Sequence, residues 1–120
     1  MAEPQFKHIR MIDRDGVAVV TFGDAQLMYE MTVVTEIGDE LISLITTHGY
    51  TRIILDFKNV QYLSSTMLAK LAKLDQQTHQ AKGWMRLCGL GPILKDTLRI
   101  GHFDRVFDVR DDIDSALKAP

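Results

Sequence analysis

The chain has 120 residues, 46% hydrophobic and 25% charged, so it is the size of one ordinary domain and needs no metal or disulfide support for its core. Its net charge of −2 gives no electrostatic footprint for binding nucleic acid or an anionic membrane. The single Cys88 excludes an internal disulfide, no apolar run approaches the ~20 residues of a membrane span, and the start lacks a signal-peptide pattern, so we expect a cytoplasmic protein.

In the first half of the chain, the spacing of the apolar residues changes twice. Two short apolar segments are separated by the polar turn Asp13-Arg14-Asp15-Gly16, which predicts a β-hairpin. After Gly23, apolar residues recur on one helical face, and we expect a helix over 30–48. The continuous aliphatic residues of 52–57 then predict a strand that is buried on both faces, as in a parallel sheet.

The second half continues the alternation of helix and strand. A second helix is predicted from 64–66 to Lys82-Gly83, followed by a strand over 84–90. The apolar stripe of this helix is expected to consist of Met67, Leu68, Leu71 and Leu74. Gly91-Pro92 opens a short third helix, because proline is well tolerated at the first helical position. The side chains expected to face inward from this helix are Ile93, Leu94 and Leu98.

The end of the chain predicts a last short strand over 106–109 and a terminal helix capped by Asp111-Asp112. Ile113, Ala116 and Leu117 would be its buried residues. The resulting order is β-β-α-β-α-β-α-β-α, which implies right-handed crossovers and an α/β fold with a mixed, mostly parallel sheet. We expect one domain over 1–120, because no linker or repeat divides the chain.

No sequence signature of an enzyme is present. There is no G-x-S-x-G elbow, Walker loop or G-x-G-x-x-G, so we expect no catalytic residue, metal or cofactor. Gly89-Leu90-Gly91-Pro92 favours a tight turn over a phosphate-binding loop. Cys88 is expected to be a buried, inert thiol. The histidines lack metal-ligand spacing and are expected at the surface or at strand edges; they are His8, His48, His79 and His102.

Three consecutive hydroxyl residues, Ser64, Ser65 and Thr66, lie where the second helix is expected to begin. One of them would be enough to cap the helix. A phosphoryl group on another would face the positive end of the helix dipole, so capping alone and a phosphoacceptor role both stay open. The segment Leu27-Met28-Tyr29-Glu30-Met31 either packs under its loop or forms an exposed patch for a partner protein.

Residues 53–68, Ile-Ile-Leu-Asp-Phe-Lys-Asn-Val-Gln-Tyr-Leu-Ser-Ser-Thr-Met-Leu, resemble the core motif of STAS domains. That family includes bacterial anti-sigma factor antagonists, stressosome proteins and the cytosolic tails of SulP anion transporters. Its typical pattern is an aliphatic strand ending in aspartate, then N-V, an aromatic, an aliphatic and D-S-S/T-G-hydrophobic. The element order resembles the family fold over about 5–118, and so do Leu87-Cys88-Gly89-Leu90 and Phe107-Asp108-Val109.

The resemblance implies an anti-sigma factor antagonist in bacterial transcription regulation and signal transduction, with an anti-sigma factor that is a serine kinase as its partner. In such antagonists the hydroxyl before the motif glycine is phosphorylated, which corresponds to Thr66 here, with Ser65 before it. Ser64 replaces the family aspartate and Met67 replaces the family glycine, which would add bulk where a kinase approaches. The candidate partner-binding residues are Gln26, Met28, Tyr29, Glu30, Tyr62, Met67 and Lys70, with Lys73 on the same helix face.

Other functions remain open from the sequence. The altered motif favours a phosphorylation-independent scaffold or sensor module, as in a stressosome. A small-ligand-binding STAS domain would use a pocket lined by Tyr29, Tyr62 and Met67. Lys70 and Lys73 would serve either a partner or a solvated helix face. Self-association into a homo-oligomer is undecided, because the sequence does not separate exposed apolar residues from buried ones.

Overall fold

The computed structural model describes residues 6–23 and 30–118. Its first element is a β-hairpin. Strands β1 (Ile9–Arg14) and β2 (Val17–Phe22) pair in antiparallel register, with Met11 opposite Val20. Asp15 and Gly16 both have positive φ, and the Asp13 carboxylate accepts a hydrogen bond of 2.9 Å from the Gly16 N–H. The hairpin predicted from the sequence is therefore confirmed.

The remaining elements follow in the predicted alternation. Helix α1 spans Met31–Thr46, β3 spans Arg52–Asp56, α2 spans Ser65–Gln80 and β4 spans Trp84–Cys88. They are followed by α3 (Pro92–Ile100), β5 (Asp108–Val109) and α4 (Ile113–Leu117). A 3₁₀ turn at Phe103–Arg105, which the sequence did not predict, precedes the last strand, and β5 covers only the second half of the expected 106–109.

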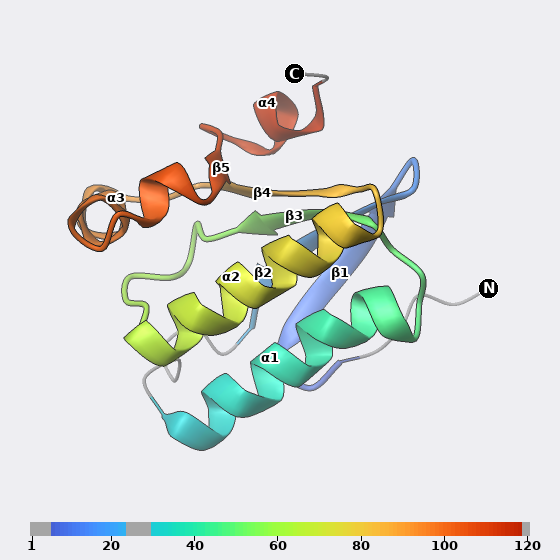
Figure 1. The fold of residues 1–120 in the computed structure, drawn as a ribbon, viewed down its shortest axis with the longest axis horizontal. Helices are drawn as coiled ribbons and strands as arrows, with labels where there is room; N and C mark the ends of the chain where they lie inside the picture. The colour runs from blue at the N-terminus through green and yellow to red at the C-terminus, as the bar shows by residue number, and fades with distance from the viewer. Residues whose placement is uncertain (1–5, 24–29, 119–120) are drawn as a thin grey trace.

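The five strands form one sheet in the order β1-β2-β3-β4-β5. Among the strand pairs of residues 6–23 and 30–118, only β1–β2 is antiparallel, so the mixed, mostly parallel sheet is confirmed. Figure 1 shows α1 and α2 side by side along one face of the sheet, with α4 on the opposite side of β3 and β4. In the described residues, no helix is both long and apolar enough to cross a membrane.

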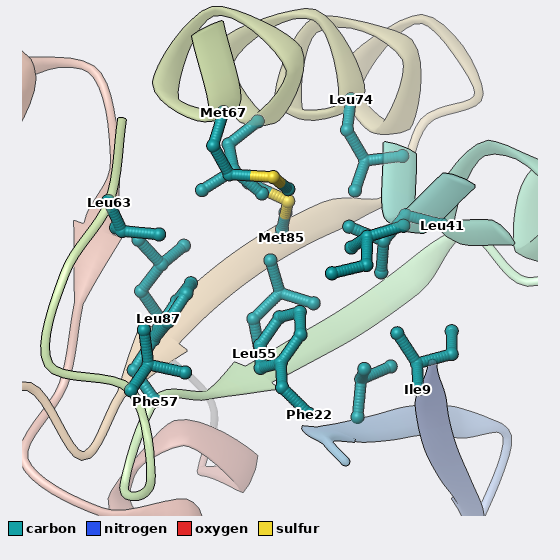
Figure 2. Close-up of a cluster of buried hydrophobic side chains, with 14 of the residues drawn as sticks. Ile9, Phe22, Leu41, Leu55, Phe57, Leu63, Met67, Leu74, Met85 and Leu87 are labelled. Carbon is teal, nitrogen blue, oxygen red and sulfur yellow. The ribbon is translucent and has the colours of Figure 1, made fainter. Parts of the chain in front are cut away.

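The two faces of the sheet bury separate apolar clusters, and alternate residues of β3 serve each one. Ile53 and Leu55 join the main cluster beneath α1 and α2, whereas Ile54 joins a smaller cluster beneath α4. This double burial explains why 52–57 reads as a continuous aliphatic run. Figure 2 shows the main cluster, where Met67 of α2 lies beside Met85 of β4 and Leu74 of α2 points into the cluster on the side of Leu41.

Helix α4 has only five residues and is held to the sheet by Arg86. The guanidinium lies over the Trp84 ring at 3.8 Å and donates hydrogen bonds of 2.8 Å to the carbonyls of Ala116 and Lys118. Asp112 and Ser115 form a reciprocal capping box at the other end of the helix, as the sequence predicted for Asp112. Both ends of this short helix are therefore tied down.

Several burial predictions fail. Ile93 is 70% exposed, because the narrow apolar stripe of α3 is made by Leu94 and Leu98, which are buried as predicted. Ile113 and Leu117 are only half-buried beside the buried Ala116. His8, expected at the surface or at a strand edge, directly precedes the edge strand β1 but is not at the surface. Its side chain is 5% exposed, and its Nε2 lies 3.3 Å from the Glu36 carboxylate on α1.

Candidate functional site

The hydroxyl cluster lies at the junction of the loop after β3 and the first turn of α2. Ser64 has an extended backbone, and its Oγ accepts a hydrogen bond of 3.0 Å from the Met67 N–H. This is the N-cap interaction that satisfies a backbone donor left free at the start of a helix. Ser64 is therefore the capping residue of α2, and its side chain is engaged in the free protein.

The next two hydroxyls are not needed for capping. Ser65 is exposed and Thr66 is half-exposed. Within the described part of the chain, neither side chain takes part in a hydrogen bond that competes with modification. Two hydroxyls thus remain at the surface of the first turn of α2, beside the free N–H groups and the positive end of the helix dipole.

Met67 does not belong to this surface. Its side chain is 0% exposed and points from α2 toward the sheet, near Met85 (Figure 2). The predictions that Met67 contacts a partner and that its bulk faces an approaching kinase are therefore wrong, because the third residue of α2 faces the core. The pocket expected from Tyr29, Tyr62 and Met67 fails for the same reason.

The other predicted partner residues lie in different environments. Tyr62 is 58% exposed in the loop before α2, and Glu30 is exposed before α1. Lys70 is half-buried: a Cβ atom at Gly38 of α1 would lie 2.7 Å from Lys70 Cδ, so the stem of this lysine packs across the two helices. The predictions for Gln26, Met28 and Tyr29 fall outside the described residues.

The charges around the cluster favour an anion. The first turn of α2 contains no acidic residue, so nothing on the helix opposes a negative charge on Ser65 or Thr66. Lys70 follows Thr66 by four residues, the spacing at which side chains on one helix face interact. Lys73 is exposed one turn further along α2.

Cys88, the last residue of β4, is a poor nucleophile. Its side chain is 0% exposed, and burial raises the pKa of the thiol to about 12, with smaller contributions from Asp56 and Asp112. The buried thiol predicted from the sequence is confirmed. Among residues 6–23 and 30–118, no group of three or more His, Cys, Asp or Glu side chains is arranged to hold a metal ion.

A hollow that the sequence did not predict lies at the carboxyl ends of β2 and β3. Its polar lining includes Arg10 of β1, Thr21 of β2 and Asp56 of β3. These residues are far apart in the sequence and occur singly, so only their alternation with core residues in each strand signals that they share a face.

Comparisons with known proteins agree with this architecture. A family model for the STAS domain matches residues 8–116. No curated protein matches the chain at a significant level. Solved structures do match, at identities that establish the fold alone.

Three of these structures illustrate the range. A STAS domain protein described as an anti-sigma-factor antagonist from Planctomyces limnophilus has a TM-score of 0.78 and 21% identity, covering 91% of this chain and 94% of its own. An anti-sigma factor antagonist from Mycobacterium paratuberculosis has a TM-score of 0.76 and 21% identity, covering 91% and 89%. A stressosome structure has a TM-score of 0.70 and 17% identity, covering 90% and 92%. With the fold, its element order and most of its length matched, this chain belongs to the STAS domain family.

Proposed function

We propose that this chain is an anti-sigma factor antagonist, a non-enzymatic regulator that binds an anti-sigma factor with serine kinase activity and thereby frees a sigma factor. The proposal is supported by membership of the STAS family and by the structural likeness to anti-sigma factor antagonists. Under this proposal, residues 1–120 form one STAS domain. The protein acts in the cytoplasm, where the transcription machinery is found.

The observation that carries the proposal is that the three hydroxyls have different roles: one caps the helix and two are accessible. Ser64 caps α2, so Ser65 and Thr66 are available to a kinase without loss of the cap. Asp is as good an N-cap as Ser, so Ser64 keeps the structural role that the family aspartate would have at this position. Met67 occupies the place of the family glycine but directs its bulk into the core, away from the kinase.

Phosphorylation would act as a switch through charge. A phosphoryl group on Ser65 or Thr66 adds about −1.5 to −2 charges at neutral pH. The helix dipole and Lys70 would accommodate these charges in the free domain. A partner surface that packs against the neutral hydroxyls and Tyr62 would have to desolvate this charge and would dissociate.

The test is a pull-down from lysate of the native cell, comparing wild type with Ser65→Glu and Thr66→Glu. Wild type should retain an anti-sigma factor, and the glutamate variants should lose it. Thr47→Glu is the control, because Thr47 is exposed at the far end of α1, where it provides the C-cap. Retention of the same partner by all variants would contradict the switch.

Incubation of the purified pair with ATP, followed by mass spectrometry, tests the covalent step directly. A phosphate is expected on Ser65 or Thr66 and should be absent from the Ser65→Ala, Thr66→Ala double variant. A phosphate elsewhere, or none, would overturn the assignment of these acceptors.

A second candidate function is a phosphorylation-independent scaffold or sensor module. The motif departures at Ser64 and Met67 and the likeness to a stressosome structure favour it. It predicts partner binding that is unaffected by ATP, and assembly of the chain into large particles that are visible by light scattering.

A further inference from the structure

We propose that the hollow at the carboxyl ends of β2 and β3 binds a small phosphorylated metabolite that carries amino or hydroxyl donors at its other end. The hollow has a volume of about 390 Å³, which is ample for a sugar phosphate. It lies on the face of the sheet opposite α1 and α2. The inference is independent of the proposed regulatory function.

The strand register builds the site. Arg10 is paired with Thr21 across β1 and β2, and Val20 is paired with Leu55 across β2 and β3. The residues that follow Val20 and Leu55, Thr21 and Asp56, therefore point away from the main core and join Arg10 on the other face. The Arg10 guanidinium, the Thr21 hydroxyl and the Asp56 carboxylate thus lie on the same face of three neighbouring strands.

The loops that the structure describes leave these three side chains open. Helix α4 packs on β3 and β4, and Ile12 of β1 is 57% exposed, so none of the segments that the structure describes covers this face over β1. The turn after β3 brings Lys58 and Asn59 to the rim, held by a hydrogen bond of 3.0 Å from the Lys58 N–H to Asp56 Oδ1. Carboxyl ends of parallel strands are where open α/β sheets bind ligands.

The cations are available to an anion. Arg10 and Lys58 are exposed, and neither forms an ion pair with any residue in the described part of the chain. A guanidinium beside an ammonium suits phosphate, which accepts charge-assisted hydrogen bonds from both.

A charge gradient orients the ligand. A second hollow of about 300 Å³ shares Asp56 and Lys58 with the first and is lined by three further aspartates, Asp111, Asp112 and Asp114. The phosphate therefore lies toward Arg10, and the donor end lies toward Asp56 and these aspartates. An ammonium gains more from this arrangement than a hydroxyl does, because it is attracted to the carboxylates as well as hydrogen-bonded to them.

The experiment is calorimetric titration of the full chain with inorganic phosphate, glucose 6-phosphate and glucosamine 6-phosphate. Affinity should rise in that order, into the range of about 0.1–1 mM for the amino sugar phosphate. Arg10→Gln and Lys58→Gln should each weaken all three ligands by about tenfold or more. Lys73→Gln, an exposed cation on the opposite face, is the matched control and should bind as wild type does.

Asp56→Asn tests the orientation. The amide oxygen still accepts the Lys58 N–H, so the turn is kept, while the negative charge is removed. The preference for glucosamine 6-phosphate over glucose 6-phosphate should shrink by about tenfold, and phosphate alone should bind at least as well as to wild type. Failure of all three probes to bind wild type, or binding that Arg10→Gln and Lys58→Gln leave unchanged, would overturn the proposal.

Discussion

Replacing Met67 tests whether this residue, which stands where the family motif has glycine, contributes to the stability of the core. The side chain is 0% exposed and lies among the buried residues between α2 and the sheet. Truncating a buried methionine to alanine costs ~2–5 kcal/mol, because apolar contacts are lost and a cavity remains. Glycine in a helix costs about 1 kcal/mol more than alanine, so Met67→Gly, which restores the family residue, should destabilise by about 3–6 kcal/mol.

The free energy of unfolding would be measured by urea titration, monitored by circular dichroism and by the fluorescence of Trp84. Met31→Ala is the matched control, because Met31 is 62% exposed at the start of α1 and its truncation should change stability by about 0.5 kcal/mol or less. Met67→Leu conserves volume and should cost less than about 1.5 kcal/mol. If Met67→Gly were as stable as wild type, Met67 would not be supporting the core and the reasoning would be refuted.

Four further predictions follow from other contacts. Ser64→Ala removes the α2 cap and should lower the free energy of unfolding by about 1 kcal/mol in the same urea assay, and an unchanged value would contradict capping. Arg86→Met leaves the last carbonyls of α4 without their buried donor, so hydrogen exchange of the α4 amides should accelerate by about tenfold or more while α1 stays protected. Because the pKa of Cys88 is raised to about 12, a thiol reagent should react at neutral pH only as the protein unfolds, at a rate that rises with urea; fast labelling of the native protein would disprove this. Hydrogen bonds from Ser115 hold the pKa of Asp112 below its ordinary value of 3.8, so its stabilisation of α4 is present above that pH and is lost as the pH falls through the lower folded value; exchange in α4 that is insensitive to acid would contradict it.

Local patterns were enough to predict most of the fold. The polar turn ending in Gly16 predicted the hairpin, and the change from period two to a helical period predicted α1 within two residues at each end. The aliphatic run at 52–57 predicted a strand with both faces covered, which the two apolar clusters confirm. These signals are local, because each depends on a few neighbouring residues and on the chain's need to bury one face.

The candidate site was predicted less well. Its location at the start of α2 and the capping role of one serine follow from the sequence, but the sequence did not say which hydroxyl caps. For Met67 the sequence supports two conflicting predictions: helical periodicity places it in the apolar stripe of α2, which is confirmed, whereas its motif position suggests a partner contact, which is wrong. His8 is expected at the surface or at a strand edge; it directly precedes the edge strand β1, but α1 covers it and brings Glu36 within 3.3 Å.

By itself, the sequence determined the order of elements, the mixed sheet and the position of the hydroxyl cluster, because periodicity and turn chemistry act over a few residues. Tertiary packing alone decided that Ser65 and Thr66 stay accessible and that Arg10, Thr21 and Asp56 line one hollow. The physical reason is that exposure and proximity depend on which faces of distant segments meet, and strand register and helix rotation set those meetings across the whole chain.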